Sequence, residues 1–114
     1  MDRDHNHAGL LAGTLDLLIL KVLSLSELHG YAIAQNSHRM SREALRVEEG
    51  SLYPALQRME VRGWVKSMSK KTPTGRQARY YSLTTAGRKQ LDAETESFQR
   101  SVLATTRVLR SVEP

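Results

Sequence analysis

The sequence predicts a mainly α-helical fold with one small β-hairpin, an α+β class, and three observations lead to it. The first half of the chain carries segments whose apolar residues recur at helical spacing. Two short segments with alternating apolar and polar residues then flank a polar loop that contains proline and glycine. A segment of roughly 28 residues with helical spacing follows. The 114 residues can bury one modest core, so we expect one small domain with an extended arm.

The composition excludes several kinds of chemistry, and the positive charge is concentrated in one segment of the sequence. The chain has no cysteine, which excludes a disulfide framework, a thiolate nucleophile and a cysteine metal site. The formal net charge of +5 is concentrated in residues 58–79, where seven Lys and Arg residues and one Glu give 7 − 1 = +6, while the rest of the chain sums to 5 − 6 = −1. A focused basic segment is typical of a surface that binds a polyanion, although scattered cations usually form a solvated strip.

Residues 1–12 have the polar composition of a flexible tail. Their acidic start differs from a signal peptide, and no apolar run approaches the ~18 residues that cross a bilayer. The two histidines within residues 5–7 could bind a metal, but a flexible tail offers no preformed site. We therefore expect a soluble, cytoplasmic protein without a metal or cofactor.

The segment that starts at Thr14 is the clearest helix. Its apolar residues fall at positions i, i+3, i+4, i+7 and i+8, namely Leu15, Leu18, Ile19, Val22 and Leu23. Thr14 is expected to cap the start, and Asp16 suits the positive end of the helix dipole. Additional leucines elsewhere on its circumference predict that this helix is central and mostly buried.

A second helix is predicted within residues 27–40, after a turn marked by His29 and Gly30. His29 could act as a pH switch, but a turn or capping histidine is the commoner case. The segment that follows has few strong signals. Leu45 and Val47 could form a very short strand there.

The third helix contains Pro54. Proline costs little in the first turn of a helix, where the backbone N–H groups have no intrahelical partner. We therefore expect Ser51 to be the N-cap and Pro54 to be the third helical residue. The apolar stripe of this helix consists of Leu52, Leu56 and Met59. Gly63 is well placed to end the helix.

Residues 64–84 predict two short strands around a polar loop. Tyr81 and Leu83 alternate with Tyr80 and Ser82, which is the pattern of a half-buried strand. We expect Tyr81 in the core and Trp64 between the third helix and the hairpin. Stacking of a nucleobase on the tyrosines, or of a ligand on the tryptophan, is the less favoured alternative.

A long helix is predicted from Thr84 or Thr85 to about Ser111, within a C-terminal segment of residues 85–114. A heptad seam runs along it: Leu91, Thr95, Phe98, Val102, Thr105 and Leu109. A helix of ~28 residues spans about 40 Å, too long for so small a domain to cover. A second copy of the chain is the simplest cover for the apolar side, with Leu91, Phe98, Val102 and Leu109 in the dimer interface.

Three helices, a ribbon with a cationic tip and a long helix are the elements of a winged helix-turn-helix domain, here residues 13–84, followed by a dimerisation helix. In that architecture the third helix enters the DNA major groove, and the hairpin, called the wing, touches the neighbouring backbone or minor groove. The basic segment falls on these two elements. Fold pattern and charge together therefore favour double-stranded DNA as the partner.

Three segments resemble the signature of the PadR family of bacterial transcriptional regulators: "LHGYAIAQ", "GSLYPALQRMEVRGWV" and "TGRQARYYSLTTAGRKQL". The resemblance runs from about Gly13 to Leu91, in the family's order and spacing. It implies a winged-helix repressor that dimerises through its C-terminal helix, binds a pseudo-palindromic operator and is often released by a small molecule. The opening segment "TLDLLILKVLS" and the C-terminal helix, which is short for this family, resemble the small, single-domain branch. The loop "SMSKKTPTGRQ" departs from the commoner acidic, tryptophan-containing run.

The expected DNA contacts lie on the third helix and the wing. Ser51 is expected to meet a phosphate because helix starts favour anions. The resemblance implies that Tyr53 of the "LYP" motif, with Pro54 beside it, faces DNA. Gln57 and Arg58 follow one turn later and can read adenine and guanine. The wing contacts are expected from Lys70, Lys71, Thr74, Gly75, Arg76 and Arg79, which bind phosphates or, at the glycine, let Arg76 approach a narrow minor groove.

Two other classes of function fit the sequence less well. Winged helices also serve as protein–protein interaction modules, but such a module does not need +6 charges over the third helix and wing. An enzyme is not expected, because Ser51 has neither a strand–turn–helix elbow nor a matching His and acid, and no other catalytic constellation is recognisable.

Overall fold

The structure is a computed structural model that describes residues 13–114, so the predicted tail and its two histidines lie outside the described residues. Four helices and a three-stranded antiparallel sheet make up the fold, which confirms the α+β class. In chain order the elements are α1 (Thr14–Leu25), β1 (Leu28–His29), α2 (Gly30–Met40), α3 (Glu49–Val61), β2 (Val65–Lys71), β3 (Gln77–Leu83) and α4 (Thr85–Arg110). The sheet order is β1-β3-β2.

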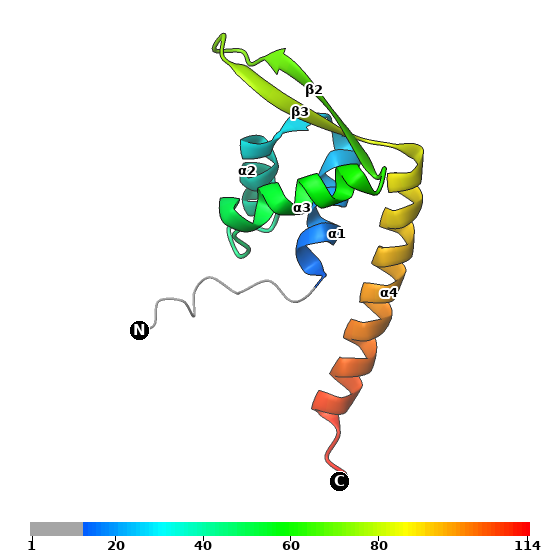
Figure 1. Cartoon of the computed structure of the whole chain (residues 1–114). Helices are drawn as coiled ribbons and strands as arrows, with labels where there is room; N and C mark the ends of the chain where they lie inside the picture. The colour runs from blue at the N-terminus through cyan, green and yellow to red at the C-terminus, as the bar shows by residue number, and fades with distance from the viewer. Residues whose placement is uncertain (1–12) are drawn as a thin grey trace.

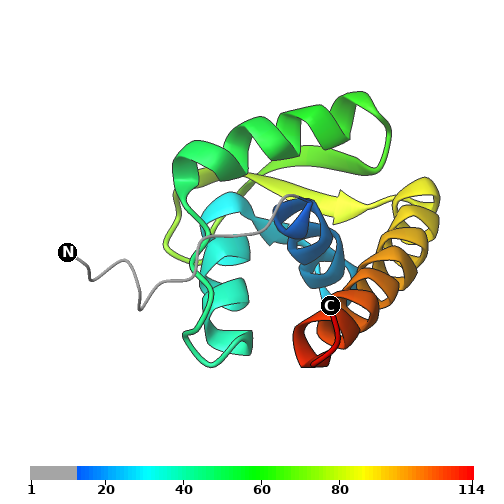
Figure 2. The same cartoon turned by 90° about the horizontal axis from the view of Figure 1, so that it is seen from below.

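The three short helices pack beneath the sheet, and α4 leaves this body and extends away from the wing (Figure 1). Seen from below, α4 runs alongside α1 on the side opposite α2, and α3 crosses above them (Figure 2). The core combines α1, α2, α3 and the sheet. Its fully buried large side chains are Ile19, Leu20, Ile33, Leu52, Leu56, Met59 and Val65. The prediction that the first helix is central is confirmed.

The N-terminus of α1 differs from the sequence prediction. Gly13, with φ 84°, is the N-cap, and no side-chain hydrogen bond caps the helix. The Thr14 hydroxyl is buried and has no hydrogen-bond partner among the described residues. The prediction that Thr14 caps the helix was therefore wrong, because the residue already belongs to the first helical turn. Asp16 lies in that turn as expected.

Helix α2 begins at Gly30, within the predicted turn, and Leu28 and His29 before it pair with Tyr81 and Tyr80 of β3. His29 is the N-cap, and its Nδ1 atom accepts a hydrogen bond of 3.3 Å from the backbone N–H of Ala32. The capping role of His29 is confirmed. In the segment after α2, Leu45 makes a single bridge and Val47 belongs to the core, so the predicted short strand there is reduced to one residue.

Helix α3 begins one turn earlier than predicted. Its N-cap is Glu48, whose carbonyl oxygen accepts hydrogen bonds from the N–H groups of Ser51 (3.0 Å) and Leu52 (2.9 Å). The prediction of Ser51 as N-cap was therefore wrong, and Pro54 is the sixth helical residue instead of the third. Because proline lacks an N–H, it leaves the carbonyl of Gly50 without its usual helical donor.

The C-terminus of α3 agrees with the prediction. Gly63 has φ 79°, a conformation that favours glycine. Its N–H donates to the Glu60 carbonyl, and the N–H of Trp64 donates to the Met59 carbonyl, both at 3.0 Å. This pair of bonds is a Schellman motif, which satisfies two of the last carbonyls and turns the chain into the hairpin.

The hairpin of β2 and β3 is confirmed, with Val65 opposite Leu83 and Lys71 opposite Gln77. Tyr81 and Leu83 are buried as predicted. Burial raises the pKa of the Tyr81 phenol above its ordinary value. Trp64, directly before β2, packs against the core. Its place between α3 and the hairpin stays a prediction.

The end of β3 and the start of α4 are joined tightly at Trp64. The Thr84 N–H donates to the Trp64 carbonyl (3.0 Å), and the Thr84 hydroxyl donates to the Gly63 carbonyl (2.6 Å) and accepts from the Gly87 N–H (3.0 Å). A Cβ atom at Gly87 would lie only 2.1 Å from the Trp64 carbonyl oxygen. This close approach explains the glycine near the start of α4.

Within residues 13–114, no helix is both long and apolar enough to span a membrane.

Candidate nucleic-acid interface

The exposed side of α3 has two flanks that face different neighbours. Tyr53, Gln57 and Glu60 are spaced at i, i+4 and i+7 and therefore share one flank. Glu60 accepts a hydrogen bond of 2.7 Å from Ser67 of β2, so this flank faces the wing. Arg58 belongs to the other flank, where its guanidinium lies 2.5 Å from the Asp16 carboxylate of α1.

Tyr53 lies over the start of α2. A Cβ atom at Gly30 would lie 2.6 Å from Cε1 of the Tyr53 ring and 2.7 Å from its hydroxyl oxygen. The glycine of the segment "LHGYAIAQ" thus makes room for this ring. The Tyr53 side chain nevertheless remains 44% exposed, so contact with Gly30 orients the phenol without burying it.

The strand register divides the wing cations between the two faces of the hairpin. Ser67 pairs with buried Tyr81, and the next pairs on that face are Ser69 with Arg79 and Lys71 with Gln77. Arg79 donates a 2.7 Å hydrogen bond to the Ser67 hydroxyl, which in turn donates to Glu60. Lys71 and Arg79 therefore face the same side as the wing flank of α3. We call Tyr53, Gln57, Lys71 and Arg79 the α3–wing surface.

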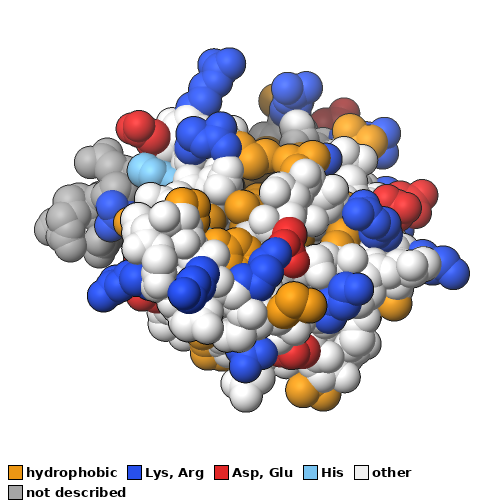
Figure 3. All heavy atoms as spheres, turned by 90° about the horizontal axis from the view of Figure 1, so that it is seen from above, with side chains coloured by type: hydrophobic (Ala, Val, Ile, Leu, Met, Phe, Trp, Pro, Cys, Tyr) orange, Lys and Arg blue, Asp and Glu red, His pale blue; other side chains and the backbone are white. Residues whose placement is uncertain are grey.

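Lys66 and Lys70 lie on the opposite face of the hairpin, together with Met68 and Tyr80. The Lys70 ammonium pairs with the Glu27 carboxylate and lies 4.9 Å from the centre of the Tyr80 ring. Seen from above, Lys and Arg side chains surround hydrophobic ones on this face of the molecule (Figure 3). Lys70 was predicted to bind a DNA phosphate, and in the structure without DNA it pairs with the Glu27 carboxylate.

The tip of the wing is a short, polar turn. The Gly75 N–H donates to the Thr72 carbonyl (2.9 Å), and the Thr72 N–H donates to the Arg76 carbonyl (2.7 Å). Gly75 has φ 89°, which explains the glycine in this turn. The hydroxyls of Thr72 and Thr74 lie 3.0 Å apart. Thr74, Gly75 and Arg76 are all exposed at the tip, as expected for residues that approach DNA.

The remaining predicted contacts lie on α3. Ser51 and Pro54 are exposed, near the start and in the middle of the helix. Ser51 is seven residues before Arg58, so it lies on the flank that faces α1. Of the eleven predicted residues, four thus lie on the α3–wing surface and three at the wing tip. Arg58 and Lys70 pair with carboxylates of the same chain, and Ser51 and Pro54 are exposed elsewhere on α3.

Three acidic residues of the interface were missed by the sequence interpretation. Asp16, Glu27 and Glu60 contact Arg58, Lys70 and, through Ser67, Arg79. Two of these contacts join residues 42 and 43 positions apart in the chain. No local pattern in the sequence signals such contacts. The contact of Glu60 with Ser67 is different, because the two residues are seven positions apart on either side of the predicted turn at Gly63, so their proximity could have been predicted.

Residues 19–93, with their exposed third helix and cationic wing, match the family described as "Transcriptional regulator PadR-like family". The chain belongs to the PadR-like family of transcriptional regulators. The resemblance of the three sequence segments is thereby confirmed. Family membership implies DNA binding, and because the family's members are transcriptional regulators, this PadR-like chain is not an enzyme.

Curated relatives include a transcriptional regulator of Mycobacterium tuberculosis, which is 35% identical over 83 residues, 73% of this chain and 74% of the relative. An uncharacterised transposon protein of Streptomyces fradiae is 40% identical over 84 residues, 74% of this chain. Those residues are 23% of the transposon protein, so the chain spans less than a quarter of that relative.

Two crystal structures illustrate the fold of the family. A PadR-like transcriptional regulator from Bacillus cereus is 28% identical, with a TM-score of 0.74 over 89% of this chain and 96% of that chain. A PadR family transcription regulator from Clostridium difficile is also 28% identical, with a TM-score of 0.72 over 85% of this chain and 99% of that chain. The winged-helix fold with its long C-terminal helix is confirmed by these likenesses.

The C-terminal helix of the PadR-like chain carries an uncovered apolar side. Leu91 packs against the core, but Phe98 is 37% exposed and Val102 is 45% exposed. Leu109, farther along, is more exposed still. A groove between α1 and α4 continues this side, with Leu17 and Leu18 of α1 among its lining residues together with Leu91 and Phe98.

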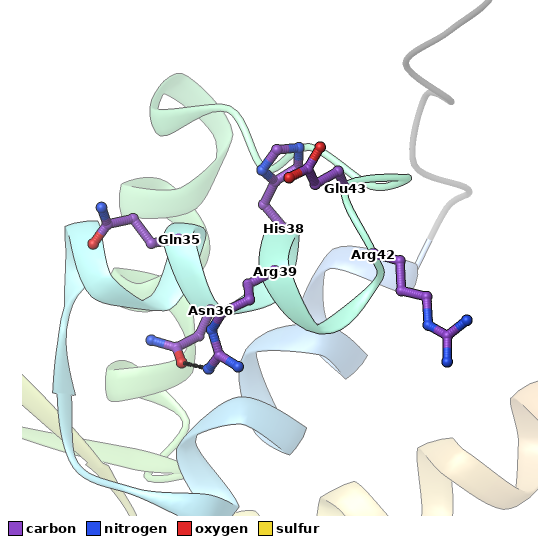
Figure 4. A pocket seen from close by; sticks show the side chains of 6 residues that line it. All are labelled: Gln35, Asn36, His38, Arg39, Arg42 and Glu43. Carbon is purple, nitrogen blue, oxygen red and sulfur yellow. Dashed lines mark hydrogen bonds between the residues drawn. The ribbon is translucent and has the colours of Figure 1, made fainter.

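A second hollow lies at the end of α2 and is lined by polar and charged residues (Figure 4). Its lining residues are Gln35, Asn36, His38, Arg39, Arg42 and Glu43. Asn36 accepts a hydrogen bond from Arg39, and Arg42 points away from the other side chains. Residues 13–114 contain no group of three potential metal ligands.

Proposed function

We propose that the chain is a cytoplasmic, homodimeric, sequence-specific DNA-binding repressor. The single observation that carries this proposal is the α3–wing surface, where Tyr53 and Gln57 of the third helix face the same side as Lys71 and Arg79 of the hairpin. Family membership adds the expectation that α3 enters the major groove and that the wing contacts the flanking backbone.

The roles of the residues follow from their chemistry. Gln57 can make a bidentate contact with adenine, and Tyr53, oriented by Gly30, can reach a phosphate or a base edge. Lys71, Arg76 and Arg79 supply phosphate contacts without sequence preference. Ser51 and Thr74 offer hydroxyl donors, while Pro54 and Gly75 shape the backbone at the helix and the wing tip.

Homodimerisation is supported by the apolar side of α4. Phe98, Val102 and Leu109 are exposed on a helix that extends beyond the winged-helix body (Figure 1). Two copies paired through this side would present two recognition helices to half-sites about one DNA turn, roughly 34 Å, apart. A small molecule that changed the angle between the two copies would release the operator.

The test is a footprint on the DNA upstream of the gene, followed by titration of the bound segment and of random duplex at several salt concentrations. Affinity is expected to fall steeply with salt for both, because counterions are released on binding. Replacement of Gln57 by Ala should weaken operator binding more than random binding. Binding that is insensitive to salt would overturn the proposal and favour a protein–protein module.

The dimer is tested by sedimentation with and without operator. Replacement of Phe98 by Glu places a charge in the proposed interface and should shift the equilibrium to monomer, since burial of one large apolar side chain is worth about 1.5–3 kcal/mol. A wild-type chain that sediments as a monomer on its operator at micromolar concentration would overturn the dimer.

A further inference from the structure

Two cations of the proposed DNA-binding elements pair directly with carboxylates of the same chain, and a third is linked to a carboxylate through a hydroxyl group. Arg58 of α3 lies 2.5 Å from Asp16 of α1. Lys70 of the wing pairs with Glu27, which precedes β1. The third carboxylate, Glu60 of α3, accepts a hydrogen bond from the Ser67 hydroxyl, which in turn accepts one from Arg79. The three carboxylates therefore come from three different parts of the chain.

The two direct pairs differ in exposure. The Asp16 side chain is 18% exposed and its Arg58 partner 45%, whereas Glu27 and Lys70 are 40% and 42% exposed. Ion pairs whose side chains remain partly exposed contribute little to the stability of a protein. DNA phosphates can therefore exchange with the carboxylates, more readily at Lys70 than at Arg58, whose partner Asp16 is less exposed. The negative charge nevertheless stays beside the cation after the exchange and repels the phosphate.

We infer that Arg58 and Lys70, which lie beside the α3–wing surface on α3 and on the wing, also contact DNA phosphates, and that Asp16 and Glu27 compete with these phosphates for the two cations. The inference rests on the proposed function and concerns the strength of that same site. In the free protein the carboxylates hold the cations; on DNA they have to release them. Phosphate affinity is thereby kept low, which matters most on random DNA, where phosphate contacts supply essentially all of the binding.

The size of the effect follows from counterion release. A protein that neutralises one more phosphate steepens the dependence of log K on log salt by about 0.9, which corresponds to roughly fivefold in affinity near 0.15 M salt. Neutralising Asp16 or Glu27 should therefore raise the affinity for random duplex by roughly fivefold per protomer and steepen the salt slope by about 0.9 per protomer.

The experiment measures binding of wild type, Asp16→Asn and Glu27→Gln to random duplex over a range of salt concentrations. Glu113→Gln is the matched control, because it changes the net charge equally at an exposed residue beyond the end of α4, at the opposite end of the molecule from the wing (Figure 1). Asp16→Asn and Glu27→Gln are expected to bind more tightly with a steeper slope, while Glu113→Gln should stay near wild type. Thermal unfolding of each variant identifies any loss of fold.

A second comparison isolates the ion pair itself. In an Arg58→Ala background, Asp16→Asn should raise the affinity much less than in the wild type, because the competed cation is gone. An equal gain in both backgrounds, no gain in either variant, or weaker binding would overturn the inference while leaving DNA binding intact. A wild-type protein without salt-dependent binding would instead overturn the proposed function, and the inference with it.

Discussion

Replacing Gly87 by Ala tests whether the joint between the hairpin and α4 is as tight as the structure shows. The new Cβ atom would lie 2.1 Å from the carbonyl oxygen of Trp64 and 2.7 Å from Cδ1 of Leu83. The leucine methyl can rotate away, but the carbonyl oxygen belongs to the backbone. That oxygen also accepts the 3.0 Å hydrogen bond from the Thr84 N–H, so it cannot move without disturbing the N-terminus of α4.

The expected loss of stability can be worked from these contacts. Carbon–oxygen contacts between segments are comfortable at about 3.3 Å, so the joint must open by about 1.2 Å. Overpacking typically costs about 1–3 kcal/mol, and loss of one hydrogen bond costs about 1 kcal/mol. Alanine recovers about 0.5–1 kcal/mol through its better helix propensity. The net destabilisation is about 1–3 kcal/mol, which lowers the Tm by about 5–20 °C.

The assay is thermal unfolding followed by circular dichroism, with every variant at the same protomer concentration because dimerisation would make the Tm concentration-dependent. Gly50→Ala in α3 is the control, because a Cβ atom there has nothing within 4 Å. This control should be as stable as wild type or more stable by about 0.5–1 kcal/mol. If Gly87→Ala matched or exceeded the stability of wild type, the close approach of Trp64 to α4 would be refuted.

Three further outcomes are expected. Gly30→Ala should push the half-exposed Tyr53 ring aside, and therefore reduce operator affinity severalfold while changing the Tm little; both are measured on one preparation. Thr84→Val removes the N-cap acceptor of the Gly87 N–H and should cost about 1 kcal/mol in denaturant unfolding. Because burial raises the pKa of Tyr81 above its ordinary 10.0, folding stability is fully present below that pH and is lost as the pH rises through the higher folded pKa. Stability measured against pH should therefore decline less above pH 10.0 in Tyr81→Phe than in wild type.

The elements were predictable where a local pattern specifies them. The stripe of α1, the alternation around Tyr81 and the glycine after α3 each depend on residues within a few positions. Strand β1 was not predicted, because two residues are too few to show an alternation of apolar and polar side chains. Its partner strand β3 is also far away in the sequence, with Leu28 opposite Tyr81. The start of α3 was misjudged because serine and proline favoured one position, whereas the extended Glu48 supplies the first carbonyl of the helix.

The candidate site was predictable as a set of residues but not as a surface. Sequence alone identifies an exposed third helix and a cationic hairpin. It cannot tell that Gln57 and Arg58, adjacent in the chain, lie on opposite flanks, because this depends on how α3 packs against its neighbours. Lys70 and Lys71 likewise lie on opposite faces of the hairpin, because neighbouring residues of a strand point to opposite sides. Which of the two faces α3 follows only from the pairing of β2 with β3.

The winged-helix body and α4 form one unit, and this has a consequence for how two copies would read DNA. Thr84 and Gly87 fix α4 to the hairpin, and α1 packs between α4 and α3. If two copies pair through α4 as proposed, the separation of their recognition helices is set by the angle at which the α4 helices cross. A helix of 26 residues is about 39 Å long, so a rotation of about 10° at one end displaces the other by about 7 Å. That displacement is about one fifth of the half-site spacing of roughly 34 Å. A modest change in crossing angle is therefore sufficient to take one recognition helix out of its half-site while the other stays bound.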